Sequence, residues 1–77
     1  MILGSQIKAA RILLKITQAE LAKSTKTSVD TLKRIEKSEG DYAGSAELFF
    51  KIQSTLEKKG IRFENGKGEF GVRLVKK

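Results

Sequence analysis

The chain has 77 residues and contains neither cysteine nor histidine. Without cysteine there is no disulfide bond and no thiolate metal site, and the fold does not depend on redox state. Without histidine the protein lacks the commonest general base and a common metal ligand, so catalysis would have to use scattered carboxylates, lysines and hydroxyls. We therefore expect a protein that is not an enzyme and needs no metal ion or other cofactor.

Long apolar runs are also missing. No stretch of the sequence approaches the roughly 18 apolar residues that a membrane-spanning helix requires. The opening residues, MILGSQIK, lack the basic region and the long apolar core of a signal peptide. We expect a soluble, cytoplasmic protein.

Positive charge is what the chain has in excess. Sixteen lysines and arginines stand against nine acidic residues, which gives a net charge of +7 and a pI near 9.9. Such an excess in a small domain suggests a polyanionic partner, with nucleic acid first and an acidic membrane surface second. The simpler alternative is a solvated surface that happens to be basic. Hydrophobic residues make up 39% of the chain, enough for one compact domain with a small core.

The first 36 residues show helical periodicity in three short segments. Ser5 is a candidate N-cap for a helix over 5–14 with Lys15 near its C-terminus, and Ile12 and Leu13 widen its apolar face, so we expect this helix to be covered on more than one side. Thr17 and Glu20 form a capping-box pattern that opens a second helix. The polar run STKT then predicts a turn, and Ser28 is the expected cap of a third helix.

The rest of the chain predicts a fourth helix and a β-hairpin. After a glycine-containing loop over 37–44, Ser45 is the expected cap of a helix whose apolar stripe is Leu48, Phe49, Ile52 and Leu56 and which Gly60 ends. Beyond Gly60 the apolar residues alternate, which predicts strands over about 61–64 and 71–75. Asn65 and Gly66 are a strong hairpin-turn signal at a glycine-rich tip.

Two short helices joined by a tight polar turn are an arrangement in which the second helix can protrude and enter the DNA major groove. Ala22 permits the two helices to cross closely, while Leu32 and Ile35 would bury the inner side of the second one. The stretch TQAELAKSTKTSVDTLKRIE resembles the lambda-repressor-like (Cro/repressor, Xre-type) helix-turn-helix DNA-binding family. The resemblance runs from about Ile7 to Glu36, and the residues that carry it are Arg11, Thr17, Gln18, Ala19, Glu20, Leu21, Ala22, Ser28, Thr31, Leu32, Arg34, Ile35 and Glu36.

The resemblance implies a mainly α fold. We expect a four-helix lambda-repressor-like domain over residues 1–59, with the helix-turn-helix formed by its second and third helices. Residues 60–77 would add a C-terminal β-hairpin, a candidate dimerisation element of the same domain. The implied function is sequence-specific binding of double-stranded DNA by a homodimer on a palindromic operator.

We expect this transcriptional regulator to be a repressor, because the chain shows no obvious polymerase-activating or ligand-sensing domain. Two other hypotheses remain open. One is an antitoxin-like or other protein-interaction module that also binds DNA. The other is a non-specific RNA or nucleoid binder, which would discriminate little between duplexes.

Carried over from the family, the DNA-binding positions are Thr17, Gln18, Lys26, Ser28, Val29, Asp30, Lys33 and Arg34. Arg34 would donate to guanine O6 and N7, Val29 would pack on a thymine methyl group, and Lys33 would contact a phosphate. Asp30 would either accept from cytosine N4 or act only as a structural first-turn residue. Lys26 replaces the glycine that the family usually has in the turn, at a cost of roughly 1 kcal/mol for a left-handed backbone.

Two further expectations concern tertiary contacts. The family pairs the positions of Arg11 and Glu36, so we expect an ion pair, the alternative being that both are solvated. An isolated hairpin is marginally stable, so residues Ile61 and Phe63 should pack inward. We expect dimer contacts from residues Phe50, Phe70, Val72 and Leu74, the alternative being a monomer whose hairpin only covers its own helices.

Overall fold

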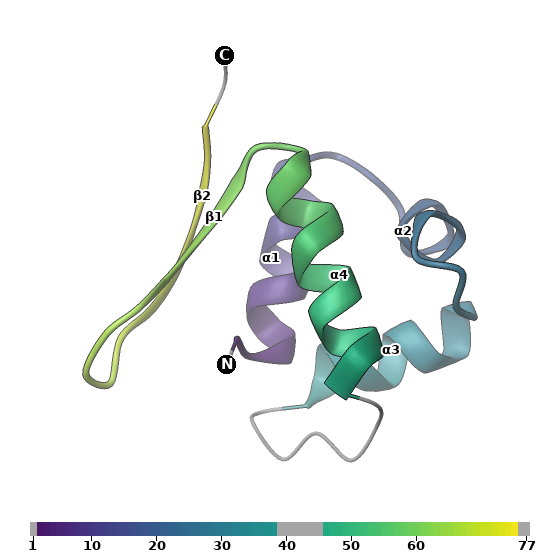
Figure 1. The fold of residues 1–77 in the computed structure, drawn as a ribbon, viewed down its shortest axis with the longest axis horizontal. Helices are drawn as coiled ribbons and strands as arrows, with labels where there is room; N and C mark the ends of the chain where they lie inside the picture. Colours follow the sequence, from purple (N-terminus) through teal and green to yellow (C-terminus); the bar gives the residue numbers. More distant parts are fainter. Residues whose placement is uncertain (1, 39–45, 76–77) are drawn as a thin grey trace.

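The structure is a computed structural model that describes residues 2–38 and 46–75. Four helices are followed by one antiparallel two-stranded sheet (Figure 1). The elements are α1 (Gly4–Leu13), α2 (Gln18–Ser24), α3 (Val29–Lys37), α4 (Ala46–Lys58), β1 (Ile61–Asn65) and β2 (Phe70–Leu74). The predicted fold class, four helices with a C-terminal hairpin, is confirmed.

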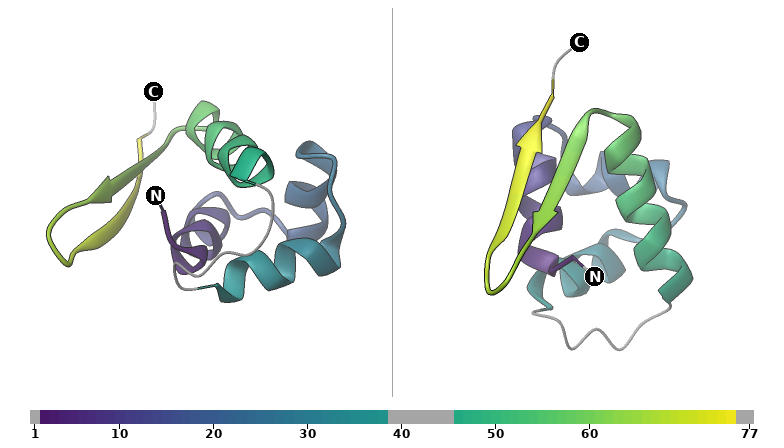
Figure 2. Two further views of the ribbon diagram at one scale, coloured as in Figure 1. Left: turned by 60° about the horizontal axis from the view of Figure 1, so that its bottom comes forward. Right: turned by 60° about the vertical axis from the view of Figure 1, so that its left-hand side comes forward.

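Helices α1 and α4 form the centre of the molecule. Helix α3 crosses one end of this pair, and α2 and the hairpin lie on opposite sides of it (Figures 1 and 2). The apolar stripes predicted for the helices meet in a single core, which consists of Ile2, Ile7, Ala10, Leu21, Ala22, Leu32, Ile35, Phe49, Ile52, Leu56 and Ile61. The outer faces of α2 and α3 are therefore left to solvent at one end of the body, away from the hairpin.

The first helix does not begin as the sequence suggested. Ser5 lies inside α1, and the capping contact comes instead from Gln6, whose Oε1 accepts a hydrogen bond from the backbone N–H of Leu3 at 2.7 Å. Gly4 N–H donates to Ser38 O at 3.0 Å, and a Cβ at Gly4 would lie only 2.0 Å from Ile35 O. The start of α1 is thus determined by its contact with the end of α3.

Helices α1 and α2 end in the same way. After each helix a lysine adopts the left-handed conformation, Lys15 with φ 58° and Lys26 with φ 56°. The amide of the next residue donates back into the last turn, Ile16 N to Arg11 O at 3.2 Å and Thr27 N to Ala22 O at 2.9 Å. Both ends are Schellman motifs with lysine where glycine is usual, and Lys15 lies beyond the helix rather than in its last turn.

Helix α4 follows a part of the chain that is outside the described residues, as is the expected cap Ser45. Phe49, Ile52 and Leu56 are buried, as the stripe predicted, and Leu48 is half-buried. The helix ends before Gly60, which has φ 104°. A Cβ at that position would lie 2.8 Å from Val75 O, so the close approach of β2 also favours glycine.

The hairpin is longer at its tip than predicted. Asn65 belongs to β1 and pairs with Phe70, and the turn is closed by a hydrogen bond from Gly66 N to Glu69 O at 2.8 Å. The left-handed residue of the turn is Gly68, with φ 74°. The Asn-Gly signal therefore marks the start of the turn and not its centre. Asn65 Oδ1 accepts from Gln6 Nε2 at 2.7 Å, which holds it in the strand.

Packing of the hairpin corrects two expectations. Val72 pairs with Phe63 and Leu74 with Ile61, so all four share one face and pack against the core of their own chain. The expected division, with β1 facing inward and Val72 and Leu74 facing a second copy, is wrong in this respect. Helix α1 is also less covered than predicted, because 58% of Ile12 and 43% of Leu13 are exposed.

Candidate nucleic-acid interface

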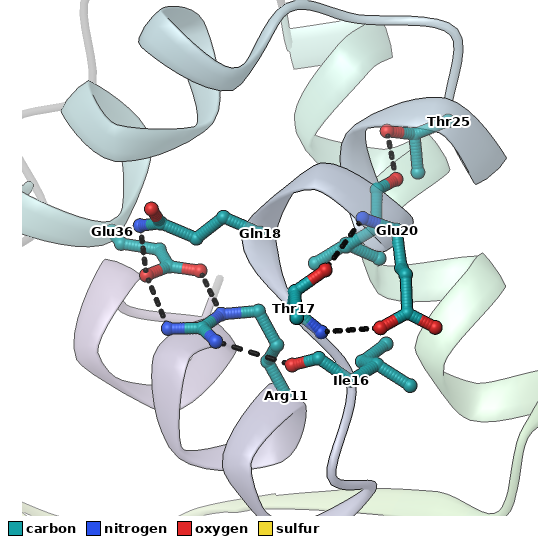
Figure 3. Close-up of polar contacts among 8 residues, drawn as sticks. Arg11, Ile16, Thr17, Gln18, Glu20, Thr25 and Glu36 are labelled. Carbon is teal, nitrogen blue, oxygen red and sulfur yellow. Dashed lines mark hydrogen bonds and ion pairs between the residues drawn. The ribbon is translucent and has the colours of Figure 1, made fainter.

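Helix α2 begins with the predicted capping box. Thr17 Oγ1 accepts from Glu20 N at 3.0 Å, and Glu20 Oε1 accepts from Thr17 N at 3.0 Å (Figure 3). The hydrogen bond from the Thr17 backbone N–H lowers the pKa of the Glu20 carboxyl most, the Thr17 side chain lowers it further, and Lys59 adds a smaller favourable charge. The reciprocal bonds fix the entry into α2, so that its N-terminus is held at one position on the surface.

The turn between α2 and α3 is fixed by one buried hydroxyl. Thr25 is 1% exposed, and its Oγ1 donates to Leu21 O at 2.9 Å. Helix α3 then begins at Ser28, whose Oγ accepts from Thr31 N at 3.1 Å and donates to Thr31 Oγ1 at 2.8 Å. Leu32 and Ile35 are buried beneath the helix. The hydrogen bonds at both ends of the turn are therefore made between groups of the helix-turn-helix itself.

The outer face of α3 carries four exposed charged residues. Asp30, Lys33, Arg34 and Lys37 follow one another at the spacing i, i+3, i+4 and i+7, which places them on a single stripe. Within the described part of the chain none of these side chains forms an ion pair or a hydrogen bond. The salt bridges in that part join Arg11 to Glu36 and Arg73 to Glu64 instead. The stripe is thus available to an external partner.

A buried carboxylate joins the three helices behind this stripe. Arg11 Nε from α1 lies 2.8 Å from Glu36 Oε2 in α3, and Gln18 Nε2 from α2 donates to Glu36 Oε1 at 3.0 Å (Figure 3). The Glu36 side chain is only 3% exposed and that of Arg11 14%. Arg11 Nη1 also donates to Ile16 O at 3.2 Å. The expected ion pair is present, and it fixes α3 relative to both other helices.

The structure brings most of the predicted DNA-binding residues onto one surface. Asp30, Lys33 and Arg34 lie on the exposed face of α3, and Lys26 is exposed in the turn before it. Val29 differs from the expectation because it is half-buried and packs against the core, so that only part of its side chain faces outward.

The capping residues keep part of their polar capacity. Thr17 and Ser28 are exposed at the starts of α2 and α3, where the positive ends of the helix dipoles favour anions. Gln18 uses one amide N–H for Glu36, and the second N–H of that amide is not used by this bond.

Two residues of the site and its support were missed. Lys37 extends the stripe by one turn, and the helical spacing from Lys33 was enough to find it. Gln6 is 4% exposed and its Nε2 donates to Asn65 Oδ1 at 2.7 Å and to Gly71 O at 3.0 Å. No local signal identifies this role, because both partners lie about 60 residues away in the sequence.

The described residues offer little for other chemistry. Among them no group of three or more aspartate and glutamate side chains is placed to hold a metal ion. None of the helices in residues 2–38 and 46–75 is long and apolar enough to cross a membrane. The exposed basic stripe of α3 is the feature with the clearest binding chemistry.

Comparison with known proteins agrees with this geometry. A family model described as helix-turn-helix matches residues 7–59, which covers most of α1 and the whole of α2, α3 and α4. No curated protein and no solved structure gives a significant match. The chain belongs to the lambda-repressor-like helix-turn-helix family of DNA-binding transcription regulators.

Proposed function

We propose that this protein binds double-stranded DNA sequence-specifically as a homodimer on a palindromic operator and represses transcription. The observation that carries the proposal is the exposed stripe on α3, whose charged side chains have no partner among the described residues. The stripe lies on a helix fixed by its cap and by the buried Glu36 network. A helix held in this way can enter the major groove without further ordering.

Chemistry divides the work among the side chains. Arg34 is suited to guanine because its planar fork donates to O6 and N7 together. Lys33, Lys37 and Lys26 are flexible point charges and are suited to phosphates. Asp30 either accepts from cytosine N4 or only stabilises the first turn of α3.

The remaining positions have smaller proposed roles. The exposed part of Val29 would contact a thymine methyl group. Thr17, Gln18 and Ser28 lie at helix N-termini and would bind the DNA backbone. These contacts would set the register of α3 on the duplex, while the stripe would read the bases.

Dimerisation supports this function for a quantitative reason. One recognition helix reaches base edges with three or four side chains, and each mismatched base pair costs about 1–3 kcal/mol. A single copy therefore discriminates weakly against the many competing sites of a genome. Two copies on a palindrome double the base contacts, and a dimer bound over a promoter would exclude polymerase, which supports repression.

Selection from a library of random duplexes with the purified protein tests this proposal. We expect enrichment of a two-fold-symmetric sequence whose half-sites lie one helical turn apart, about 10–10.5 base pairs. A reporter with the selected site in its promoter should then be expressed less when the protein is present. Enrichment of no motif, or equal binding to RNA, would contradict sequence-specific recognition.

A pair of variants tests how the stripe is used. Arg34→Ala should cost about 1–3 kcal/mol of binding and relax the preference at one base pair of each half-site. Lys33→Ala should weaken binding to all duplexes alike and lower the salt slope by about one. If both variants lose affinity equally on every sequence, Arg34 is not a base-reading residue.

A further inference from the structure

The tip of the hairpin lies near the N-terminal end of α1 (Figures 1 and 2). The strand leading to it ends with Asn65, the single asparagine of the chain, and Gly66 follows. An asparagine is most prone to deamidation when a glycine comes next, because a glycine amide can approach the asparagine side chain without interference from a Cβ. The pair is therefore a candidate site of covalent modification, separate from the stripe on α3.

The fold does not require a glycine at position 66. The left-handed conformation of the turn belongs to Gly68, with φ 74°, and Gly66 lies outside that region. A Cβ built at Gly66 would meet no heavy atom of the described residues within 4 Å. Alanine would therefore fit at this position without strain, and the geometry of the turn does not account for the Asn-Gly pair.

Deamidation would join the two residues in a cyclic imide. The Gly66 nitrogen loses its proton to solvent and attacks Cγ of the Asn65 amide. The N–Cγ bond forms, the Cγ–Nδ2 bond breaks, and Nδ2 takes up a proton and leaves as ammonia. Water then opens the imide at either of its carbonyl carbons, which gives aspartate or isoaspartate. Water is the co-reactant, and nothing is oxidised or reduced.

The folded hairpin opposes this reaction in three ways. Asn65 Oδ1 accepts a hydrogen bond from Gln6 Nε2 at 2.7 Å, which holds the side-chain amide against α1. The Gly66 N–H donates to Glu69 O at 2.8 Å, so the attacking nitrogen is engaged elsewhere. Asn65 also belongs to β1 and pairs with Phe70, and the extended backbone of a strand turns the next nitrogen away from Cγ. The ring can therefore close only after the tip opens.

Gln6 connects the tip to the rest of the fold. Its side chain is buried, its Oε1 accepts from Leu3 N at 2.7 Å, and its Nε2 donates to Gly71 O at 3.0 Å as well as to Asn65. One amide therefore holds both strands on α1. A net hydrogen bond shifts an equilibrium about two- to twelvefold, so the bonds made by Gln6 and Glu69 together should slow the reaction roughly tenfold or more.

We propose that Asn65 is a site of spontaneous deamidation whose rate is controlled by the docking of the hairpin on α1 through Gln6. The reaction is slow while the hairpin is docked and proceeds when the tip opens. This inference goes beyond the proposed function and does not depend on DNA binding, since it involves no residue of the stripe on α3.

The isoaspartate product would release the hairpin. Isoaspartate adds a methylene group to the main chain of β1 and replaces the amide that Gln6 holds, so both the pairing with Phe70 and the bond to α1 are disturbed. The purified isoaspartate form should therefore unfold at a lower urea concentration than the unmodified protein. An unchanged midpoint would overturn this release.

Incubation of the full chain at mildly alkaline pH tests the site, with one sample folded and one unfolded in guanidinium chloride. Mass spectrometry of the hairpin peptide measures the loss of the amide, and enzymatic methylation measures isoaspartate. We expect Asn65 to react in both samples, about tenfold or more slowly in the folded one. Equal rates would overturn the control by docking, and an Asn65 that stays intact in the unfolded chain would overturn the site itself.

Three variants separate the chemistry from its protection. Gly66→Ala should slow the reaction in the unfolded chain at least tenfold, because the new Cβ hinders the attack. Gln6→Leu should speed it at least tenfold in the folded protein. Ile7→Val is the matched control, because it weakens the core without removing a hydrogen bond to the hairpin, and its folded rate should stay close to that of the unmodified protein. Equal acceleration by Gln6→Leu and Ile7→Val, or none by Gln6→Leu, would overturn the role of Gln6.

Hydrogen exchange of the unmodified protein gives a test that does not depend on whether Gln6→Leu folds. The Gly66 amide reports the same opening of the tip that the reaction needs, so its exchange and the deamidation of Asn65 should be slowed by folding to a similar extent. The amide of the buried Ile52 in α4 should be slowed much more, because its exchange requires a larger opening. If deamidation is slowed as much as exchange at Ile52, global unfolding controls the reaction and the proposal fails.

Discussion

Replacing Arg11 with alanine removes the cation from a carboxylate that has almost no access to water. The Glu36 side chain is 3% exposed, and after the substitution its remaining side-chain partner is Gln18, whose Nε2 lies 3.0 Å away. Breaking a buried pair by removing one partner costs about 3–5 kcal/mol, because the remaining charge is left uncompensated. A domain of 77 residues is stable by about 4–12 kcal/mol in total. Arg11→Ala should therefore remove a large part of the stability of the fold.

The reciprocal variant should cost less. In Glu36→Ala the guanidinium of Arg11 is 14% exposed and keeps its hydrogen bond from Nη1 to Ile16 O at 3.2 Å. The remaining charge is therefore better solvated and still has one partner. Arg11→Ala should therefore be less stable than Glu36→Ala, because the Glu36 side chain is more deeply buried than that of Arg11.

Urea unfolding followed by circular dichroism measures both effects. We expect the midpoint to fall while the slope m stays constant, since the surface exposed on unfolding changes little. The control is the double replacement Arg11→Met with Glu36→Leu, which removes both charges and should cost much less than either alanine variant. A loss below about 1 kcal/mol for Arg11→Ala, the value of an exposed ion pair, would refute the claim that burial makes this pair important.

Three further predictions concern local structure. Lys15→Gly and Lys26→Gly should each raise the free energy of unfolding by about 1 kcal/mol, because both lysines have positive φ. Only Lys26→Gly should also weaken DNA binding and lower its salt slope. If the two variants bind DNA with equal affinity, Lys26 does not contact a phosphate. Gly4→Ala should destabilise by about 1–3 kcal/mol, although alanine normally favours a helix, since the new Cβ would lie 2.0 Å from a backbone carbonyl of α3; a gain in stability in thermal unfolding would refute this contact. The pKa of Glu20 is lowered by its hydrogen bonds to Thr17, so its contribution to the free energy of unfolding is present above the unfolded pKa of 4.5 and is lost as the pH falls through the folded pKa. Urea unfolding at pH 6 and at pH 3 should therefore show a larger loss of stability for the unmodified protein than for Glu20→Gln. Equal losses for the two proteins would contradict a stabilising role of the Glu20 carboxylate.

Capping and inner positions of the helix-turn-helix were correctly predicted from the sequence. Thr17, Glu20 and Ser28 make the expected hydrogen bonds, and Leu32 and Ile35 are buried. These features depend on residues three or four positions apart, whose side chains meet on any helix. For the same reason the exposed stripe of α3 could be assigned before any contact was known.

Other features depend on contacts between distant segments. The start of α1 depends on the end of α3, and the tip of the hairpin on Gln6, about 60 residues away. Nothing near Ser5 or Asn65 in the sequence signals these contacts. The predicted cap at Ser5 and the predicted turn centre were wrong for this reason.

The sequence alone determined where the helices lie, which face of α3 is buried, and the family to which the chain belongs. Only the tertiary structure decided that Val72 and Leu74 pack on their own core and that Ile12 and Leu13 remain exposed. The periodicity of an element shows that it has an apolar face, because that depends on local spacing. What covers that face depends on which other elements fit beside it, and the hairpin covers one side of α1 while leaving Ile12 and Leu13 exposed.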